Sequence, residues 1–159
     1  IGARDDLAAS YRMLPTATSA YYLGDIFLQS GGEEEAAKYL QQALRSKDQE
    51  LALAAYNKLA QIELDEMPHK YIPSRPFVGR DGYLYIDVKN TTNFRVQQVR
   101  IQLAELSGPN TVARSQVIRR SYSLAPEQKI TIKTGLGPFE DQRMAQRFQS
   151  KVIVAQPVE

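Results

Sequence analysis

The spacing of hydrophobic positions changes near the middle of the chain. Between Tyr21 and Leu44, apolar side chains recur three and four residues apart, which is the period of one helix face. Between Leu84 and Leu103 they alternate with polar ones, which is the period of a strand with one buried face. The pattern predicts an α+β protein with a helical module over residues 1–68, a linker over 69–76 and an antiparallel β-sandwich over 77–159.

The helical module is predicted to contain a helix, a turn and a second helix over residues 18–48. Gly24 has no side chain, which lets the second helix approach the first closely. Gly31 and Gly32 end the first helix, because glycine readily adopts the left-handed cap conformation. Amphipathic segments at 7–15 and 50–67 predict one further helix on each side.

These offsets resemble a tetratricopeptide repeat. The matching positions are Leu23, Gly24, Phe27, Gly31, Ala36, Leu40, Ala43 and Leu44. Asp48 departs from the family, which usually has proline there. Such stacks need about three repeats to be stable. The chain holds one repeat and two halves, so we expect this module to pack on the strand module or on repeats outside the chain.

The segment Met67–Pro76 contains three prolines, which stop a helix because proline lacks a backbone donor and restricts the residue before it. We therefore expect a linker here. His69, the only histidine, lies in this segment. A lone histidine beside proline predicts an exposed side chain rather than a ligand.

The strand module is predicted to contain five or more strands, with turns at 108–110 and 125–127. Residues 85–103 are interpreted as a hairpin whose turn is Asn90-Thr91-Thr92-Asn93, although Asn90 also fits a glycosylation sequon. The apolar run 151–155 suits a central strand. A short helix is predicted near 139–148, with Met144 and Phe148 on one face.

The sequence "VKNTTNFRVQQVRIQLAEL…LAPEQKITIKTG" resembles the small immunoglobulin-like sandwiches of bacterial envelope proteins, including the FxLYD type. In that family a strand ends in Val-x-Asn, a polar turn follows, and a long alternating strand returns. The resemblance covers residues 83–135 and implies an immunoglobulin-like antiparallel β-sandwich.

Charge and composition add three constraints. Residues 1–68 hold 6 Lys and Arg against 11 Asp and Glu, whereas residues 69–159 hold 14 against 7, so the modules carry −5 and +7. There is no cysteine, which excludes disulfides and thiolate chemistry. No apolar run approaches the ~20 residues that span a bilayer. The chain begins without methionine, and we expect it to be part of a longer protein.

Motifs for catalysis are missing from the sequence. It has no HExxH, GxxxxGK[ST], GxGxxG or GxSxG, and no Cys/His cluster. Nucleophilic catalysis with a histidine base would require His69. We therefore expect a non-catalytic region with no metal and no cofactor.

The first candidate surface is a partner-binding groove along the first helix of the repeat. The resemblance to tetratricopeptide repeats assigns four groove-lining positions, with Tyr22 beside them: Thr18, Tyr21, Asp25 and Leu28. Family members that clamp a carboxylate carry Lys and Asn at such positions, so a tyrosine and an aspartate predict a protein or an extended peptide with a basic or apolar residue. The alternative is that Tyr21 and Tyr22 only pack against a neighbouring helix.

The second candidate surface is the outward face of the strands, where aromatic and basic residues are interleaved. Such a composition suits stacking on single-stranded nucleic acid, and it equally suits cross-strand Tyr–Arg packing without a ligand. Nucleic acid is the less favoured partner. The residues are Tyr83, Tyr85, Arg100, Lys129, Lys133, Arg119 and Arg120.

The combination of repeat and sandwich resembles the C-terminal region of bacterial zinc metallopeptidases that carry tetratricopeptide repeats. This resemblance implies a non-catalytic platform for substrates or partners in a periplasmic or cell-envelope protein. The HExxH helix of that family is missing, so only the non-catalytic end is expected here. The alternative is a stand-alone envelope or secretion-system scaffold.

Overall fold

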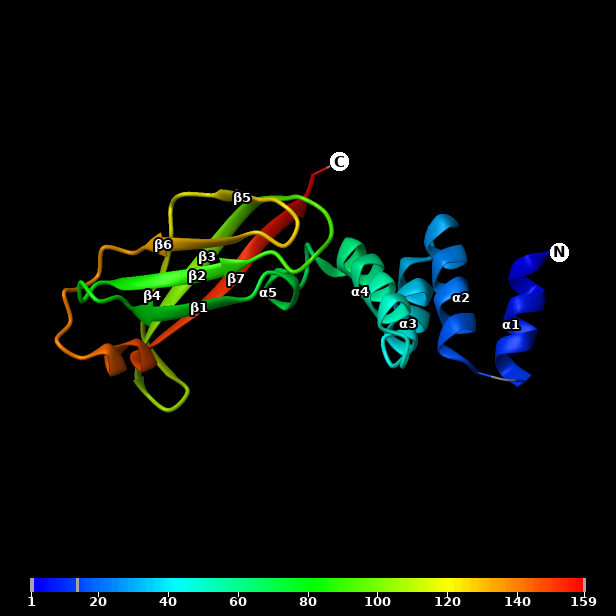
Figure 1. Ribbon diagram of the computed structural model, residues 1–159, viewed down its shortest axis with the longest axis horizontal. Coiled ribbons are helices and arrows are strands. Elements are labelled where there is room, and N and C mark those ends of the chain that lie inside the picture. The colour runs from blue at the N-terminus through cyan, green and yellow to red at the C-terminus, as the bar shows by residue number, and fades with distance from the viewer. Residues whose placement is uncertain (1, 14, 159) are drawn as a thin grey trace. The chain divides into compact units, whose positions relative to one another are not determined.

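The chain folds into a helical unit that runs to Glu63 and a strand unit that begins at Leu64. A computed structural model describes residues 2–13 and 15–158 (Figure 1). Helices and antiparallel sheets are both present, which confirms the α+β class.

The helical unit consists of antiparallel neighbours joined by short turns. Its described elements are α1 (Ala3–Met13), α2 (Ala17–Gln29), α3 (Glu33–Ala43) and α4 (Gln49–Glu63). The N-terminus of α2 is fixed by a capping box, in which Thr16 and Ser19 each accept the other's backbone N–H at 3.1 and 3.2 Å. Asp48 caps α4, since its carboxylate accepts the N–H groups of Glu50 and Leu51.

The core of this unit lies where α2 packs on α3. Leu23, Ala36 and Leu40 are completely buried. Gly24 is required at this crossing, because an added Cβ would lie 2.7 Å from Leu40 Cγ and 3.2 Å from the Ala36 carbonyl oxygen. The close helix approach predicted from Gly24 is therefore present.

The strand unit contains two antiparallel sheets. The first has the order β1 (Ser74–Val78), β2 (Leu84–Lys89), β6 (Lys129–Lys133). The second is built around β3 (Val96–Gly108), which pairs with β4 (Thr111–Val117) and β5 (Tyr122–Leu124) and, on its other side, with β7 (Phe148–Pro157). Alternate residues of β2 and β3 are buried and form the core: Leu84, Ile86, Val88, Val99, Ile101 and Leu103.

The structure corrects the predicted hairpin over residues 85–103. β2 pairs with β1 and β6, whereas β3 belongs to the other sheet, so the segment 90–95 crosses between sheets. Apolar and polar residues alternate along a strand in the same way whether its neighbour in sequence pairs with it in a hairpin or lies in another sheet. Periodicity alone could not separate the two arrangements.

Three further predictions, on the linker, the short helix and the last strand, differ from the structure. The expected linker 69–76 contains most of the short helix α5 (Pro68–Tyr71) and the start of β1, because proline is well tolerated at the first helical position. The expected helix near 139–148 is a 3₁₀ helix, η1 (Gln142–Arg147), after which Phe148 begins β7. β7 was expected to be central, yet in the described residues it pairs with β3 alone.

The crossing between the sheets is held by Asn90, whose side chain is fully buried. Its Nδ2 donates to the carbonyl oxygens of Phe94 and Ala125 at 2.8 and 3.0 Å, and to that of Leu124 at 3.4 Å. Its Oδ1 accepts from both the backbone N–H and the hydroxyl of Thr92, at 3.0 and 2.7 Å. The sequon asparagine is thus a buried structural group and offers no exposed amide to a glycan.

We predict that Asn90→Ala destabilises the strand unit by about 3 kcal/mol, because it leaves the buried Thr92 N–H without its partner and removes one donor each from the carbonyl groups of Phe94, Leu124 and Ala125. Urea unfolding, followed by the amide NMR signals of β3, measures the change. Gln156→Ala, at an exposed position of β7, is the control and should change stability by less than about 0.5 kcal/mol. Equal unfolding midpoints for the two variants would contradict this role of Asn90.

Candidate functional site

The five residues predicted to bind a partner all lie on α2, on one side of the helix. Thr18 and Tyr22 are exposed, and Tyr21, Asp25 and Leu28 are half-buried. The neighbouring face of α2, with Leu23 and Gly24, is buried against the rest of the unit. The face is therefore accessible and rests on a packed helix.

Tyr21 and Asp25 are joined by a residue that the sequence analysis missed, Lys58 of α4. The Lys58 ammonium forms an ion pair with Asp25 Oδ1 and lies 5.8 Å from the centroid of the Tyr21 ring. Asp25 Oδ2 accepts a hydrogen bond from Gln29 at 3.0 Å. Both carboxylate oxygens are thus occupied within the unit, so Asp25 is less available to a basic residue of a partner than we expected.

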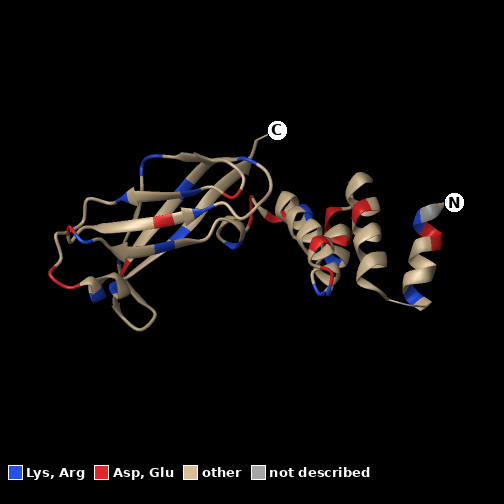
Figure 2. Ribbon diagram, in the orientation of Figure 1, with Lys and Arg blue, Asp and Glu red and all other residues tan. Residues whose placement is uncertain are grey.

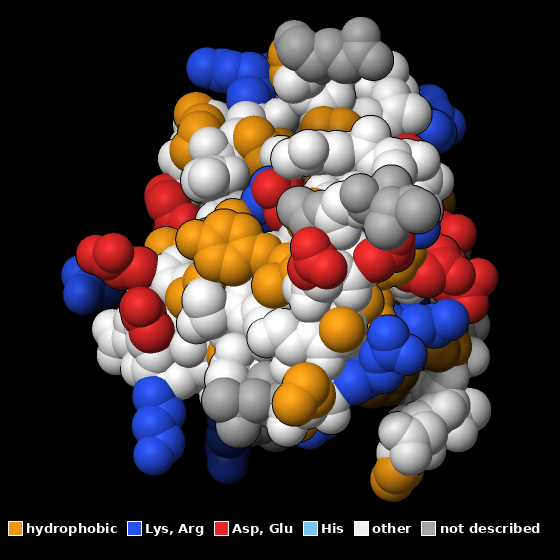
Figure 3. All heavy atoms as spheres, turned by 90° about the vertical axis from the view of Figure 1, so that its right-hand side faces the viewer, with side chains coloured by type: hydrophobic (Ala, Val, Ile, Leu, Met, Phe, Trp, Pro, Cys, Tyr) orange, Lys and Arg blue, Asp and Glu red, His pale blue; other side chains and the backbone are white. Residues whose placement is uncertain are grey.

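The aromatic part of this face remains accessible. Tyr22 is 54% exposed, and its ring lies edge-on to that of Tyr21 with 5.6 Å between the centroids. Figure 3 views the molecule from the side at the right of Figure 1 and shows hydrophobic side chains separated by acidic and basic ones. Tyr21, Tyr22 and Lys58 are called the tyrosine face below. This face can offer ring surface and one partly neutralised cation to a ligand.

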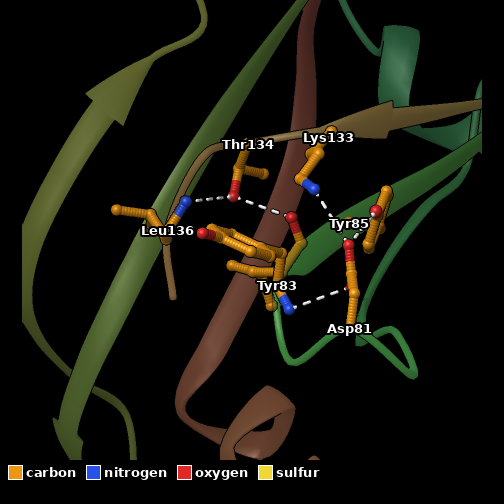
Figure 4. A network of polar contacts seen from close by, with 7 residues as sticks. Asp81, Tyr83, Tyr85, Lys133, Thr134 and Leu136 are labelled. Atoms are coloured by element: carbon orange, nitrogen blue, oxygen red, sulfur yellow. Dashed lines mark hydrogen bonds and ion pairs between the residues drawn. The ribbon is translucent and has the colours of Figure 1, made fainter. Parts of the chain in front are cut away.

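A second cluster lies where the β1–β2 loop meets the end of β6 (Figure 4). Asp81 Oδ2 accepts hydrogen bonds from the Tyr85 hydroxyl at 2.7 Å and from the Lys133 ammonium at 2.9 Å. The Lys133 ammonium also lies 4.0 Å from the centroid of the Tyr83 ring. A cation between two aromatic rings and a carboxylate is satisfied within the protein. This cluster stabilises the edge of the sheet and leaves no open cation site.

Electrostatics at this cluster follow from the same contacts. The hydrogen bond from Lys133, followed by that from Tyr85, lowers the pKa of Asp81 to about 2. Reciprocally, Asp81 raises the pKa of Lys133. Lys129 is likewise paired with Asp87, which also accepts a hydrogen bond from Thr131 at 2.6 Å. Figure 2 shows where acidic and basic residues fall along the strands.

The residues proposed for nucleic acid are divided between the two sheets, although Lys133 of the first sheet lines one hollow with Arg119 and Arg120. Tyr85, Lys129 and Lys133 belong to the first sheet, whereas Arg100 lies on β3 of the second sheet. Arg119 and Arg120 lie in the connection between β4 and β5. This division was not predicted, because the alternating pattern over residues 85–103 was interpreted as one hairpin that contains both β2 and β3.

The remaining candidates are the single histidine, a metal site and a membrane-spanning helix. His69 is exposed on α5. Across residues 2–13 and 15–158, no group of three or more His, Cys, Asp or Glu is placed to hold a metal ion. The described helices include none long and apolar enough to cross a membrane.

We predict that the carboxyl group of Asp81 titrates near pH 2 and that Lys133→Ala moves this midpoint toward its usual 3.8. The pKa is depressed in the folded state, so the contact stabilises the fold above about pH 4, and the contribution is lost as pH falls toward 2. Carboxyl ¹³C NMR measures both values, with Lys151→Ala on the other sheet as the control. A wild-type midpoint near 3.8 would refute the contact.

Comparisons with known proteins identify no relative. No protein-family model, no curated protein and no solved structure matches this chain. Its function therefore has to be inferred from the residues and their arrangement.

Proposed function

We propose that the chain is a non-catalytic protein-interaction region whose helical unit binds an extended peptide or protein segment on the tyrosine face. The observation that carries the proposal is the pair Tyr21 and Tyr22, accessible on α2 and backed by Lys58 of α4. Tyrosine offers a large contact area at a small cost in side-chain entropy, which makes it a frequent anchor of binding energy.

The packing of the helical unit supports a tetratricopeptide-like arrangement. Gly24 lies within contact distance of Leu40 across the α2–α3 crossing, as the small-residue position of such a repeat requires. Asp25 of α2 and Lys58 of α4 are 33 residues apart and paired, so the first helices of successive hairpins share a face. In stacked hairpins this shared face lines the groove that receives a ligand.

Two antiparallel sheets with buried inner faces support an immunoglobulin-like sandwich for the strand unit. The order β1-β2-β6 opposes a sheet in which β3 lies between β7 and β4. Strands that follow one another in the chain change sheets after β2, after β5 and after β6. Such alternation is the topology expected of a sandwich.

We further propose that this region serves a larger envelope protein, with a metallopeptidase that carries tetratricopeptide repeats as the first candidate and a scaffold protein as the second. The support is the repeat spacing over residues 18–48 together with the Val-x-Asn pattern at Val88–Asn90. The chain lacks HExxH, so catalysis would belong to another part of such a protein. We do not propose nucleic-acid binding, because Lys129 and Lys133 are already paired with carboxylates.

We predict that peptides selected from a displayed random library on the full chain lose affinity by roughly 5–150-fold in Tyr21→Ala and Tyr22→Ala. The selected sequences should favour apolar residues, because Asp25 is engaged by Lys58 and Gln29. Titration by fluorescence anisotropy measures the change, and circular dichroism checks the fold.

The matched control is Tyr85→Ala, a tyrosine of the strand unit whose loss should leave peptide affinity unchanged. Arg100→Ala tests the second sheet in the same way. If the two strand-unit variants abolish binding while Tyr21→Ala and Tyr22→Ala retain it, the helical face is not the binding surface.

A further inference from the structure

The strand β4 stands out because every one of its residues is exposed. Its burial pattern is exposed throughout Thr111–Val117, and Val112 and Val117 are 54% and 45% exposed. Among the described residues β4 pairs only with β3, so its other edge carries no strand. A long exposed edge with apolar side chains is a template for another chain, and many proteins block such edges for this reason.

The register identifies the backbone groups that this edge presents. Ile118 N–H donates to the Ile101 carbonyl oxygen at 2.9 Å, and Leu103 lies opposite Gln116. In an antiparallel ladder, alternate residues point their N–H and C=O groups to the same side. Gln116 and Ile118 therefore face β3, and the backbone groups of Ser115 and Val117 face outward.

Two hollows follow this edge on the side that faces the core. One, of about 390 Å³, has Leu103, Leu136 and Phe148 in its lining, with Arg114 beside them. The other, of about 480 Å³, is lined in part by Ile118, Ile132 and Tyr122. Gln116 lines both, so the hollows adjoin along β4. They would accept alternate apolar side chains of a strand added at the edge.

The charge along this edge is basic. Arg114 lines the first hollow, and Arg119 and Arg120 line the second. None of the three has an ion pair within the described residues, and the carboxylate opposite Arg114, that of Glu105, is engaged by Arg147 at 3.0 Å. Arg114 lies in β4, whereas Arg119 and Arg120 follow its end at Val117, with Arg119 in a bend.

We propose that an acidic extended peptide adds to β4 as a further strand, with its backbone on Ser115 and Val117 and its carboxylates on Arg114, Arg119 and Arg120. Backbone pairing supplies affinity in such strand addition, and pockets for alternate side chains supply selectivity. A second copy of this chain is a poorer occupant, because β4 paired with β4 would bring two sets of arginines together. This surface is independent of the tyrosine face.

The probe is a blocked nine-residue peptide with Glu at both ends and Val alternating with Thr between them, titrated into the full chain. We expect saturable binding that weakens with salt, and amide exchange protection that appears at Ser115 and Val117 without a comparable gain at Gln116 and Ile118. Val117→Pro removes the outward N–H and should weaken binding by about tenfold or more. Val117→Ala keeps that N–H and is its matched control, with less than about a threefold change.

The charge test is Arg114→Glu/Arg119→Glu, which should abolish measurable binding. Arg45→Glu/Lys47→Glu makes the same change in net charge on exposed residues of the helical unit and should leave binding intact. Any of four results overturns the proposal. These are no binding at roughly 1 mM peptide, equal binding of a peptide with Lys in place of Glu, tighter binding of single-stranded DNA at these arginines, or self-association through β4 without peptide.

Discussion

The strand unit depends on one buried side chain, Asn90, at the point where the chain leaves one sheet and enters the other. Its amide group joins the end of β2 to the start of β3 and to the turn after β5, through the carbonyl groups of Phe94, Leu124 and Ala125. Thr91 adds a hydrogen bond from its hydroxyl to the Tyr71 carbonyl oxygen at 2.7 Å. The buried backbone N–H of Thr92 is satisfied by the Asn90 side chain, and the three carbonyl groups each gain a donor from it.

That constraint also determines which surfaces the strand unit can offer. With β2 and β3 in different sheets, the aromatic and basic residues once expected on one face are divided between two. On the first sheet Lys129 and Lys133 are neutralised by Asp87 and Asp81. On the second sheet, β4 is an edge strand whose outer side pairs with no other described strand. Beside it are Arg114, Arg119 and Arg120, which have no ion pair within the described residues. The basic edge of β4, to which we propose that an acidic peptide binds, therefore results from the way the chain crosses between the two sheets.

Local physics made part of the fold predictable. Helix spacing, the Gly31-Gly32 stop and the small residue Gly24 identified α2 and the start of α3, because these signals act between near neighbours, whereas the repeat was expected to run to residue 48 and α3 ends at Ala43. Tyr21 and Asp25, one turn apart, could be placed on one face for the same reason. Lys58 could not, since its pairing with Asp25 depends on how α4 packs. The prediction that β3 pairs with β2 was wrong because pairing also depends on tertiary packing. Alternation of apolar and polar residues indicates which side of a strand is buried, but it does not indicate which strand lies beside it.

Hydrogen exchange at the crossing tests the central claim most directly. If Asn90 and Thr92 close the strand unit, the Thr92 amide and the Asn90 side-chain amide protons should exchange only on global unfolding, like the amides in the core of β3. If residues 90–93 were an ordinary exposed hairpin turn, these protons would exchange orders of magnitude faster, at rates close to that of the Asn110 amide in the β3–β4 turn. Protection of Thr92 equal to that of β3 supports the account, and exchange at the rate of that exposed turn contradicts it.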